Sequence, residues 1–323
     1  MDLNKLSRLL FELSKNSHLT TKMIAQLLNI SQQSASYTLQ KLEKERTIQN
    51  YQTVADPAKF GLVNAFLLLN YQRFDHQTTS NIKRHLKQDP NVIRIEETSQ
   101  GADLLVEYCV PNLSYFNKQH RAFLYEFKDA VRVTEAQVVI VKHLYSKNYL
   151  HKRAPDAKET IISGDRESIT LNDKQQGVLQ ALAEEPRATL INVAKKTKLD
   201  PKTIVNIRKW LQKRKIIRYY SILIDNDKLD ITREHVFITL SHSDRQDEQR
   251  FLEYCKQHKN IIALTKTIGP YDLFITTERI KKEKNVINDL RKTFTIRDYR
   301  ILITDNILKH HHLPTNLFEN DKQ

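Results

Sequence analysis

The sequence predicts an α+β protein made of two copies of one unit, each a winged helix-turn-helix followed by a ferredoxin-like βαββαβ domain. Three observations predict this. Residues recur at a constant spacing of 169 positions. Each copy begins with apolar residues at helical spacing, and each then changes to an alternation of strand and helix patterns. A period of this length fits a whole domain pair rather than a solenoid repeat. The recurring pairs include Ala25 and Ala194, Ile30 and Leu199, Leu42 and Leu211, Ile48 and Ile217, Tyr51 and Tyr220, Asp56 and Asp225, Asn91 and Asn260, and Asp103 and Asp272.

The domain boundaries follow from shifts in this pattern. A polar stretch with Pro155 and Gly164 lies between the copies, and it predicts a linker because it offers little to bury. The tail is polar, and we expect it to fray. The predicted ranges are 1–56 for the first helix-turn-helix, 60–146 for the first ferredoxin-like domain, 147–170 for the linker, 171–226 for the second helix-turn-helix, 232–312 for the second ferredoxin-like domain and 313–323 for the tail.

The first helix-turn-helix is predicted from spacing and capping residues. Residues 3–15 carry apolar side chains at helical spacing, and Thr20 or Thr21 can cap a short helix that reaches Leu28. Ser31 can cap a third helix that reaches about Arg46, and residues 47–54 alternate like a strand. Two short helices that cross at a sharp turn need a small residue where they approach, and Ala25 supplies it.

The first ferredoxin-like domain is predicted by an order of strand, helix, strand, strand, helix, strand. Such an order forms a four-stranded antiparallel sheet with both helices on one face. The expected strands are 64–71, 92–97, 104–110 and 138–144, and the expected helices are 75–87 and 114–127.

The second copy repeats the same order of predicted helices and strands. In its third helix Asp200 is the predicted N-cap, and Pro201 stands at the first helical position, which suits its fixed φ. The last strands match at 163 positions instead of 169, as Val139 and Leu302 show, so the first copy carries about six extra residues between its third and fourth strands. The expected segments are helices 173–183, 189–197 and 201–215, a strand 216–224, and a sheet domain that begins near Glu234 and ends near Lys309.

Composition favours a polyanionic partner. The chain has 40% hydrophobic and 28% charged residues, enough for cores, and a formal net charge of +14. Cys109 and Cys255 are too few for a disulfide scaffold or a thiolate metal site. Cys109 falls in an apolar strand-like run and Cys255 in a helical stretch, and we expect both to be small core residues in a reducing cytoplasm. The sequence shows no secretory signal and no apolar run long enough to cross a membrane. We therefore expect a cytoplasmic protein.

The third helix of the second copy is the predicted reading helix, the one that enters the major groove. It carries six Lys or Arg residues and no acidic residue between positions 201 and 215. Ile204, Ile207 and Leu211 are spaced to face the core, which leaves cations for phosphates and Asn206 for an adenine edge. The alternative is a solvated lysine face without a partner. The predicted DNA-contacting residues are Lys202, Thr203, Asn206, Arg208, Lys209, Lys213 and Arg214.

The equivalent helix of the first copy is polar rather than basic. Its side chains can read bases, but cations are scarce, and Glu43 and Glu45 oppose them. We expect the second copy to supply most of the electrostatic attraction. The alternative is that the first copy has lost DNA contact and serves only for packing. Its candidate DNA-contacting residues are Gln32, Gln33, Ser34, Ser36, Tyr37 and Lys41.

Four stretches carry a family resemblance: residues 171–173 (Leu-Asn-Asp), 191–214, 216–222 and 268–274 (Ile-Gly-Pro-Tyr-Asp-Leu-Phe). On these the chain resembles, twice over, the Lrp/AsnC family of leucine-responsive (feast/famine) transcription regulators. The resemblance implies a helix-turn-helix joined to a ferredoxin-like effector domain. It also implies that the Gly-x-Tyr-Asp loop lines a small-molecule site at the sheet-domain interface, where amino acids bind. The first copy keeps the glycine and the aspartate of this loop but lacks the tyrosine.

The resemblance gives the effector-site candidates Gly101, Asp103, Gly269, Tyr271 and Asp272. A carboxylate there can pair with an α-amino group, and backbone N–H groups can bind a carboxylate. Glycine at such a loop suits a positive φ or a close backbone approach. The alternative is a structural turn whose aspartate caps backbone amides.

The sequence gives little support for metal binding or for enzymatic catalysis. The adjacent His310, His311 and His312 alternate faces on a strand and cannot all bind one metal ion from one side. No phosphate-binding loop, nucleophile elbow or zinc-protease motif is present. We therefore expect no catalytic residue, no metal and no cofactor. An enzymatic alternative is a siroheme decarboxylase, a class built from Lrp/AsnC-like subunits, and His120, Arg121 and His143 show no convergent pattern for it. A third alternative is an architectural DNA-binding protein that ignores sequence.

These observations together predict a DNA-binding transcription regulator that is not an enzyme. Its partners are double-stranded DNA and a small effector such as an amino acid. The two helix-turn-helix units would contact neighbouring half-sites, and unequal copies do not require a palindromic operator. The sheet domains would pair with one another or with those of a second chain, which makes a homodimer of tandem chains the expected oligomer.

Overall fold

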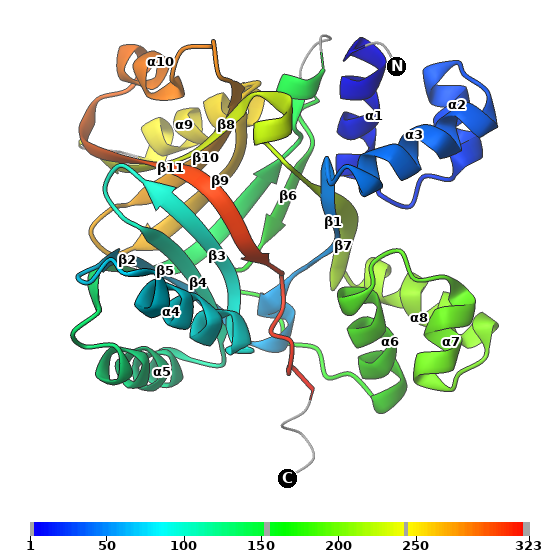
Figure 1. Ribbon diagram of the computed structural model, residues 1–323, viewed down its shortest axis with the longest axis horizontal. Helices are drawn as coiled ribbons and strands as arrows, with labels where there is room; N and C mark the ends of the chain where they lie inside the picture. The colour runs from blue at the N-terminus through cyan, green and yellow to red at the C-terminus, as the bar shows by residue number, and fades with distance from the viewer. Residues whose placement is uncertain (1–2, 152–155, 242–244, 319–323) are drawn as a thin grey trace.

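The computed structural model describes residues 3–151, 156–241 and 245–318. Figure 1 shows an antiparallel sheet domain with its covering helices on one side of the molecule and two three-helix units on the other side. Among the described helices, none is long and apolar enough to cross a bilayer. The α+β fold class and its tandem arrangement are as predicted.

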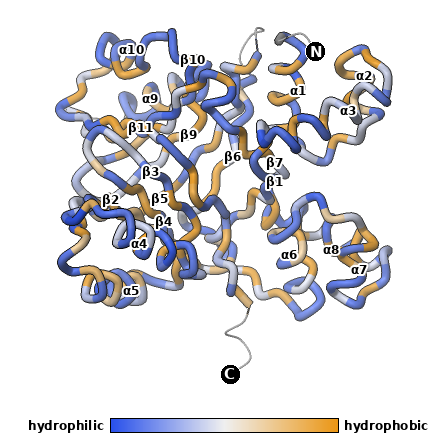
Figure 2. The backbone as a smooth tube through the Cα atoms, viewed as in Figure 1, coloured by the Kyte–Doolittle hydropathy of each residue, from blue (hydrophilic) through white to orange (hydrophobic). Residues whose placement is uncertain are grey.

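The two three-helix units form where capping residues and apolar spacing predict them. Thr20, Ser31 and Asp200 each accept a backbone N–H from the first turn of the helix that they cap. Figure 2 shows hydrophobic and hydrophilic stretches alternating along both units, as amphipathic helices require. The first unit contains α1 (Leu3–Lys15), α2 (Thr21–Leu28), α3 (Gln32–Lys44) and β1 (Ile48–Ala55), and the second contains α6 (Asp173–Glu184), α7 (Leu190–Thr197), α8 (Pro201–Lys213) and β7 (Ile217–Ile224).

The repeat extends to backbone conformation. Asn29 and its counterpart Lys198 both adopt a left-handed conformation, with φ of 51° and 56°, in the turn before the reading helix. Arg46 and Lys215, with φ of 55° and 58°, do the same just after it. Non-glycine residues rarely adopt this conformation, so its recurrence at a spacing of 169 supports a true structural duplication.

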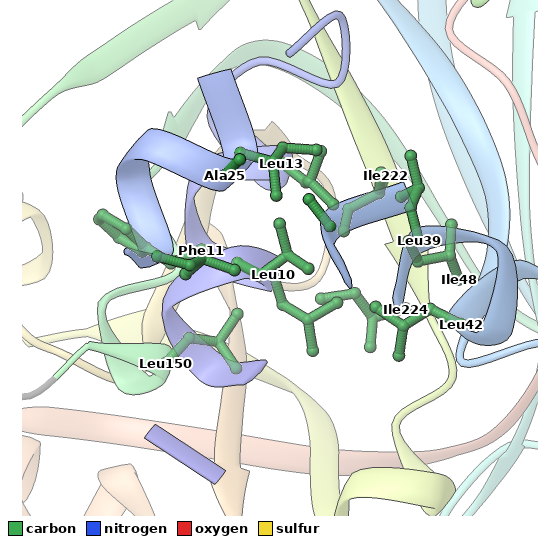
Figure 3. Packing of buried hydrophobic residues seen from close by; sticks show 14 of the residues in the cluster. Leu10, Phe11, Leu13, Ala25, Leu39, Leu42, Ile48, Leu150, Ile222 and Ile224 are labelled. Carbon is green, nitrogen blue, oxygen red and sulfur yellow. The ribbon is translucent and has the colours of Figure 1, made fainter. Parts of the chain in front are cut away.

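The two units are joined by an exchange of strands. β1 and β7 form a two-stranded antiparallel ribbon in which Gln52 pairs with Ser221. Each strand packs on the helices of the other copy: Ser221 Oγ donates to the Ser14 carbonyl at the end of α1, and the Thr53 hydroxyl donates to the Leu182 carbonyl in α6. The core of the first unit therefore includes Ile222 and Ile224 of β7, as Figure 3 shows.

Each sheet domain has the predicted ferredoxin-like order. In the first, β2 (Val63–Tyr71) pairs with β4 (Leu104–Val110) and β5 (Val131–Tyr145), and β3 (Val92–Ser99) pairs with β4. In the second, β8 (Ile231–Leu240) pairs with β10 (Leu273–Ile280) and β11 (Ile296–His310), and β9 (Ile261–Ile268) pairs with β10. The covering helices are α4 (His76–Gln88), α5 (Leu113–Glu126), α9 (Arg245–Gln257) and α10 (Val286–Thr293).

The two sheets join through both pairs of edges. β11 pairs with β3, and β5 pairs with β9, while β2 also pairs with β5. The eight strands therefore close on themselves and have no free edge among them. The sheet domains pair with one another inside the chain, which was one of the two arrangements expected.

The described parts of the segment expected as a linker, residues 147–151 and 156–170, are packed structure instead. They contain a 3-10 turn η2 (Asn148–Leu150) and a strand β6 (Glu159–Ile162) that pairs with β5. Leu150 is buried in the core of the first three-helix unit. The small number of apolar residues did not indicate packing, because a short segment needs few of them. Leu150 and Ile162 are buried, and four residue pairs join β6 to β5. The proline that marked this stretch, Pro155, lies outside the described residues.

The tail is also more ordered than expected, as far as residue 318. Leu313 is buried in the core of the second three-helix unit, and Leu317 and Phe318 pack against that core. Residues 319–323 lie outside the described part of the chain. The six extra residues of the first copy lie in its second covering helix: α5 has 14 residues, and α10 has 8.

Candidate nucleic-acid interface and effector loops

The outward face of α8 carries the predicted cations. Ile204, Ile207 and Leu211 are buried in the unit's core. Lys202 and Lys209 lie on the opposite side of the helix and are exposed. The helical spacing of the apolar residues thus turns the basic face to solvent. Asn206, Lys213 and Arg214 are exposed as well.

These cations have no acidic partner in the described structure. Over the described ranges, no ion pair involves Lys202, Lys209 or Lys213. Arg214 lies over the Trp210 ring at 5.8 Å, at the C-terminal end of the helix. Unpaired cations on one face of a helix create the positive potential that attracts a phosphate backbone.

Two of the predicted contact residues have other neighbours. The Thr203 hydroxyl donates to the Asp200 carboxylate at 2.5 Å, and the Thr203 backbone N–H donates to the same carboxylate, so this residue serves the helix cap. Arg208 is half-buried. Burial lowers the pKa of His18 in the first unit, and the nearby charge of Arg208 lowers it further. Arg208 therefore lies near the junction of the two units rather than on the outward face.

The reading helix of the first unit, α3, is exposed but has little net charge. Tyr37 is 68% exposed, and Gln32, Gln33 and Ser34 are exposed as well. Lys41 forms an i,i+4 ion pair with Glu45 at 3.8 Å, which offsets its charge. The remaining candidate, Ser36, is half-buried.

The two reading helices are held as a pair. The ribbon of β1 and β7 connects their units, and His18 of the first unit stacks on Tyr220 of β7 with ring centroids 3.8 Å apart. Arg187 of the second unit bonds Glu43 at 3.1 Å and the Tyr51 hydroxyl at 2.8 Å, both in the first. These contacts fix the relative orientation of the units within one chain, as a dimer interface would.

The effector-loop candidates lie in the loop between β3 and β4 and in the equivalent loop between β9 and β10. Gly101 has φ of 120°, and a Cβ there would lie 3.2 Å from Arg300 of β11. Gly269 has φ of 156°, and a Cβ there would lie 3.0 Å from the Ala136 carbonyl of β5. Each loop therefore packs closely on the last strand of the other copy, and this packing requires glycine.

The aspartates of these loops play equivalent structural roles. Asp103 accepts the Tyr71 backbone N–H at 2.7 Å, and Asp272 accepts the Leu240 backbone N–H at 3.0 Å, in each case at the end of the domain's first strand. Tyr271 is buried against Phe237 in the interior between the two sheets. The hydrogen bonds of the two aspartates thus fit the alternative of a structural turn whose aspartate caps backbone amides. The five candidates also lie where each loop packs on the other copy.

This arrangement predicts that Asp272→Ala lowers the free energy of unfolding by about 1–3 kcal/mol, because the Leu240 N–H loses its acceptor. Asp272→Asn keeps an acceptor oxygen and should cost less. Urea denaturation of both variants and of Asp103→Ala measures the difference. Equal stability of Asp272→Ala and the wild type would contradict the assigned role.

A second cluster, at the end of the sheet domain nearest the three-helix units, was missed by sequence reasoning. Its members alternate in sign. The three carboxylates and two arginines are buried, and the two lysines at its ends are half-buried. Lys142 pairs with Glu107, Glu107 with Arg94, Arg94 with Glu96, Glu96 with Arg233, Arg233 with Glu278, and Glu278 with Lys147. The only available signal was a charged residue within an otherwise apolar strand, such as Glu107 in β4.

The histidines at the end of β11 belong to the same region. His310 Nδ1 lies 2.9 Å from Gln52 Nε2 of β1, which connects the sheet domain to the ribbon. Burial lowers the pKa of His312 to about 3, with help from the charge of Lys142. Among the described residues, no group of three or more His, Cys, Asp or Glu side chains is placed to hold a metal ion.

Comparisons with known proteins bear first on the helix-turn-helix. Residues 7–50 match the profile of the MarR family. An uncharacterised helix-turn-helix-type transcriptional regulator of Pyrococcus abyssi is 25% identical over 136 residues, a stretch that covers 41% of this chain and 86% of that protein.

Comparisons with solved structures bear on the whole chain. The crystal structure of the siroheme decarboxylase NirDL superposes with a TM-score of 0.59 at 15% identity, covering 98% of this chain and 96% of NirDL. The L-Met complex of a transcriptional regulator from Neisseria meningitidis covers 46% of this chain at 18% identity, with a TM-score of 0.41. The full-length match supports the tandem arrangement of helix-turn-helix units and ferredoxin-like domains as the fold of this chain.

Proposed function

We propose that this chain is a sequence-specific, DNA-binding transcription regulator of the Lrp/AsnC type, and that it acts in the cytoplasm without catalysing a reaction. The observation that carries the proposal is the outward face of α8, where Lys202 and Lys209 are exposed and have no described ion pair. The match of residues 7–50 to a helix-turn-helix family and the likeness to a Pyrococcus abyssi regulator support it.

The proposed roles follow from position on the helix. Lys202, Lys209, Lys213 and Arg214 neutralise phosphates, and Asn206 reads a base edge in the major groove. Arg208 contributes to the potential from the side of the helix, and Thr203 orients the helix cap. These contacts supply affinity that depends steeply on salt.

The first unit adds sequence preference in this proposal. Gln32, Gln33 and Ser34 can accept and donate hydrogen bonds to bases, and Tyr37 can reach a phosphate. Ser36 is half-buried, and the Lys41 charge is offset by Glu45. Because the ribbon fixes the two units together, they address neighbouring half-sites that differ in sequence.

The proposed effector is an amino acid bound at the loops that contain Gly101, Asp103, Gly269, Tyr271 and Asp272. Support comes from the position of these loops at the junctions between copies, where a ligand would bias how the copies pack. A homodimer of tandem chains is also proposed. Ile268 of β9 and Ile140 of β5, 65% and 40% exposed on adjacent strands, support it as a contact surface.

Binding-site selection from random duplexes tests the proposal. We expect an asymmetric consensus whose two halves lie about one helical turn or a multiple apart. Mutating either half should weaken binding at fixed salt. If binding is steeply salt-dependent but no consensus emerges, the chain is an architectural DNA-binding protein. If no duplex binds even at low salt, the proposal fails.

A siroheme decarboxylase-like enzyme is the second candidate, and one observation favours it: the full-length fold match to NirDL, with a TM-score of 0.59. At 15% identity that match speaks for the fold alone. Adding siroheme to the protein separates the candidates, because an enzyme of this class gives a red or brown complex and removes carboxyl groups. The exposed basic face of α8 has no role in such an enzyme.

A further inference from the structure

A cavity lies inside the chain where the sheet domain meets the strand ribbon. It has about 470 Å³ of free space, including its opening to solvent. Its charged lining is Arg94, Glu107 and Lys142, and three imidazoles close it from the end of β11 and the residues after it. Ile93, Leu144 and Ile162 supply an apolar part. This mixture of a few polar groups and apolar walls is typical of small-molecule sites.

The charges around this cavity do not balance. The buried chain of ion pairs begins and ends with a lysine, so it contains four cations and three carboxylates among the described residues. The carboxylates are Glu96, Glu107 and Glu278, each at most 2% exposed. A buried charge without a counter-charge is costly, and a group that supplies one stabilises the structure.

The excess positive charge is available at the cavity. Lys142 and Arg94 both line it, and Glu107 is the one carboxylate among its described lining residues. Arg94 also lies 3.6 Å from Glu96, a carboxylate that it shares with Arg233. Glu107 is further engaged by Asn64, whose amide donates to it at 2.7 Å. Arg94 is 7% exposed, and its Nε has no hydrogen-bond acceptor among the described residues, although a Glu107 oxygen is 3.2 Å away. A buried donor without an acceptor marks a place where a ligand atom or a water belongs.

The neighbouring imidazoles add no further positive charge at neutral pH. Burial lowers the pKa of His310 and of His312, and Arg94 and Lys142 oppose their protonation further. Both rings are neutral at pH 7, and each can donate one N–H to an oxygen in the cavity.

We propose that this cavity binds a small monocarboxylate, with its carboxylate against Lys142 and Arg94 and its short aliphatic part against Ile93 and Ile162. A single negative charge balances the cluster, whereas a zwitterion would bring an additional positive charge into it. The size of the cavity, shared with its opening, limits the ligand to a few carbon atoms beyond the carboxyl group. The site is distinct from the loops of Gly101 and Gly269, which lie between β3 and β4 and between β9 and β10.

The site has a structural consequence for the strand ribbon. His310 lines the cavity and also bonds Gln52 of β1 at 2.9 Å. Pro57, which follows β1, lines the cavity as well. A bound carboxylate therefore contacts the region that joins the sheet domain to the ribbon.

Isothermal titration calorimetry and thermal unfolding of the full chain test the proposal with acetate, propionate and pyruvate as probes. Acetamide, neutral and nearly isosteric with acetate, is the matched ligand control, and alanine is the zwitterionic one. We expect saturable 1:1 binding of the carboxylates at pH 7, with a rise of the unfolding midpoint. Acetamide and alanine should give no saturable signal. Chloride and phosphate at equal concentration should not reproduce the effect.

The variant that tests the site is Lys142→Met, which removes the excess charge but keeps the aliphatic stem. Glu107 retains Arg94 and Asn64 as partners, so the variant should fold and unfold at a midpoint no lower than that of the ligand-free wild type. Its carboxylate affinity should fall at least tenfold. Lys118→Met, on the exposed face of α5, makes the same charge change elsewhere and should bind like the wild type.

Any of three results would overturn the proposal. Lys142→Met could bind the carboxylates as tightly as the wild type does, acetamide could stabilise the protein as much as acetate does, or chloride or phosphate could do so. The test is independent of DNA binding. A chain with glutamate at positions 202 and 209 should bind acetate as the wild type does, so a failure of the proposed regulator function leaves this measurement unaffected.

Discussion

Replacing both Lys202 and Lys209 with glutamate should lower the affinity for the selected DNA site by about two orders of magnitude at low salt. Both side chains are exposed on the outward face of α8, and neither has a described ion pair. Each cation that contacts a phosphate releases a counterion. The loss of each lysine should therefore also reduce the slope of log affinity against log salt concentration by about one unit. Fluorescence anisotropy across a series of salt concentrations measures both quantities.

The double variant should fold normally. Lys202 lies in the first turn of α8, where an acidic residue interacts favourably with the helix dipole, and Lys209 lies in a solvent-exposed position. The matched control is Lys118→Glu with Lys284→Glu, which makes the same change in net charge on α5 and just before α10. The control should lose little affinity. If the control and the α8 variant lose equally, net charge rather than α8 accounts for binding.

Lys41→Glu in α3 provides an internal comparison between the copies. Lys41 is already paired with Glu45, so its loss should reduce affinity by much less than the loss of Lys209. An equal or larger effect would show that the first unit supplies the electrostatic attraction instead.

Glu96→Gln should destabilise the protein by about 3–5 kcal/mol, the largest effect that we expect on stability. Glu96 is 0% exposed. Its carboxylate accepts from His235 Nε2 at 2.7 Å and from the Thr304 hydroxyl at 2.6 Å, and it lies 3.5 Å from Arg233. Removing its charge leaves two buried guanidinium groups with fewer counter-charges. Chemical denaturation with linear extrapolation gives the change in the free energy of unfolding.

The adjacent residue is the control for this substitution. Glu97 lies on the other face of β3, where it is 28% exposed and pairs with Lys83 at 2.8 Å. Glu97→Gln should cost no more than about 1 kcal/mol, because exposed ion pairs contribute little. Similar costs at the two positions would contradict a special role for the buried chain of ion pairs.

The pH dependence has a defined sign. Burial alone would raise the pKa of Glu96, but Arg233, His235 and Arg94 outweigh it and hold the pKa well below the ordinary value of 4.5. A carboxyl with a depressed pKa stabilises the folded state above its unfolded pKa, and that stability is lost as the pH falls toward the folded value. Unfolding free energies below pH 4.5 should therefore fall less steeply in Glu96→Gln than in the wild type.

Local features made the helices predictable. Thr20, Ser31 and Asp200 cap helices through bonds to residues no more than three positions away, and the sequence shows that spacing directly. The repeat made the second copy predictable from the first, and the change in spacing from 169 to 163 indicated about six extra residues between the third and fourth strands of the first copy. The exposed face of α8 was predictable because helical spacing determines which side chains face the core.

Other features depend on residues far apart in the sequence. Lys147 and Glu278 are separated by 131 positions, so nothing local indicates that they meet. The packed segment after residue 147 was missed for the same reason, because Leu150 is buried in a core that includes residues of α1, more than 130 positions earlier in the chain. Asp103 and Asp272 were correctly placed at equivalent loops, but only the folded structure shows that each accepts a backbone N–H from the preceding sheet strand.

The sequence by itself determined the duplication, the α+β class, the two helix-turn-helix units and the basic face of α8. Each of these is set by periodicity, capping or the matching of residues at one spacing, which are properties of short stretches of chain. The tertiary structure alone decided how the two copies join: the exchanged strands β1 and β7, the closed eight-stranded sheet and the buried ions between the copies. The physical reason is that hydrogen bonds between strands and attraction between buried charges depend on distance in space, and the sequence order does not specify that distance.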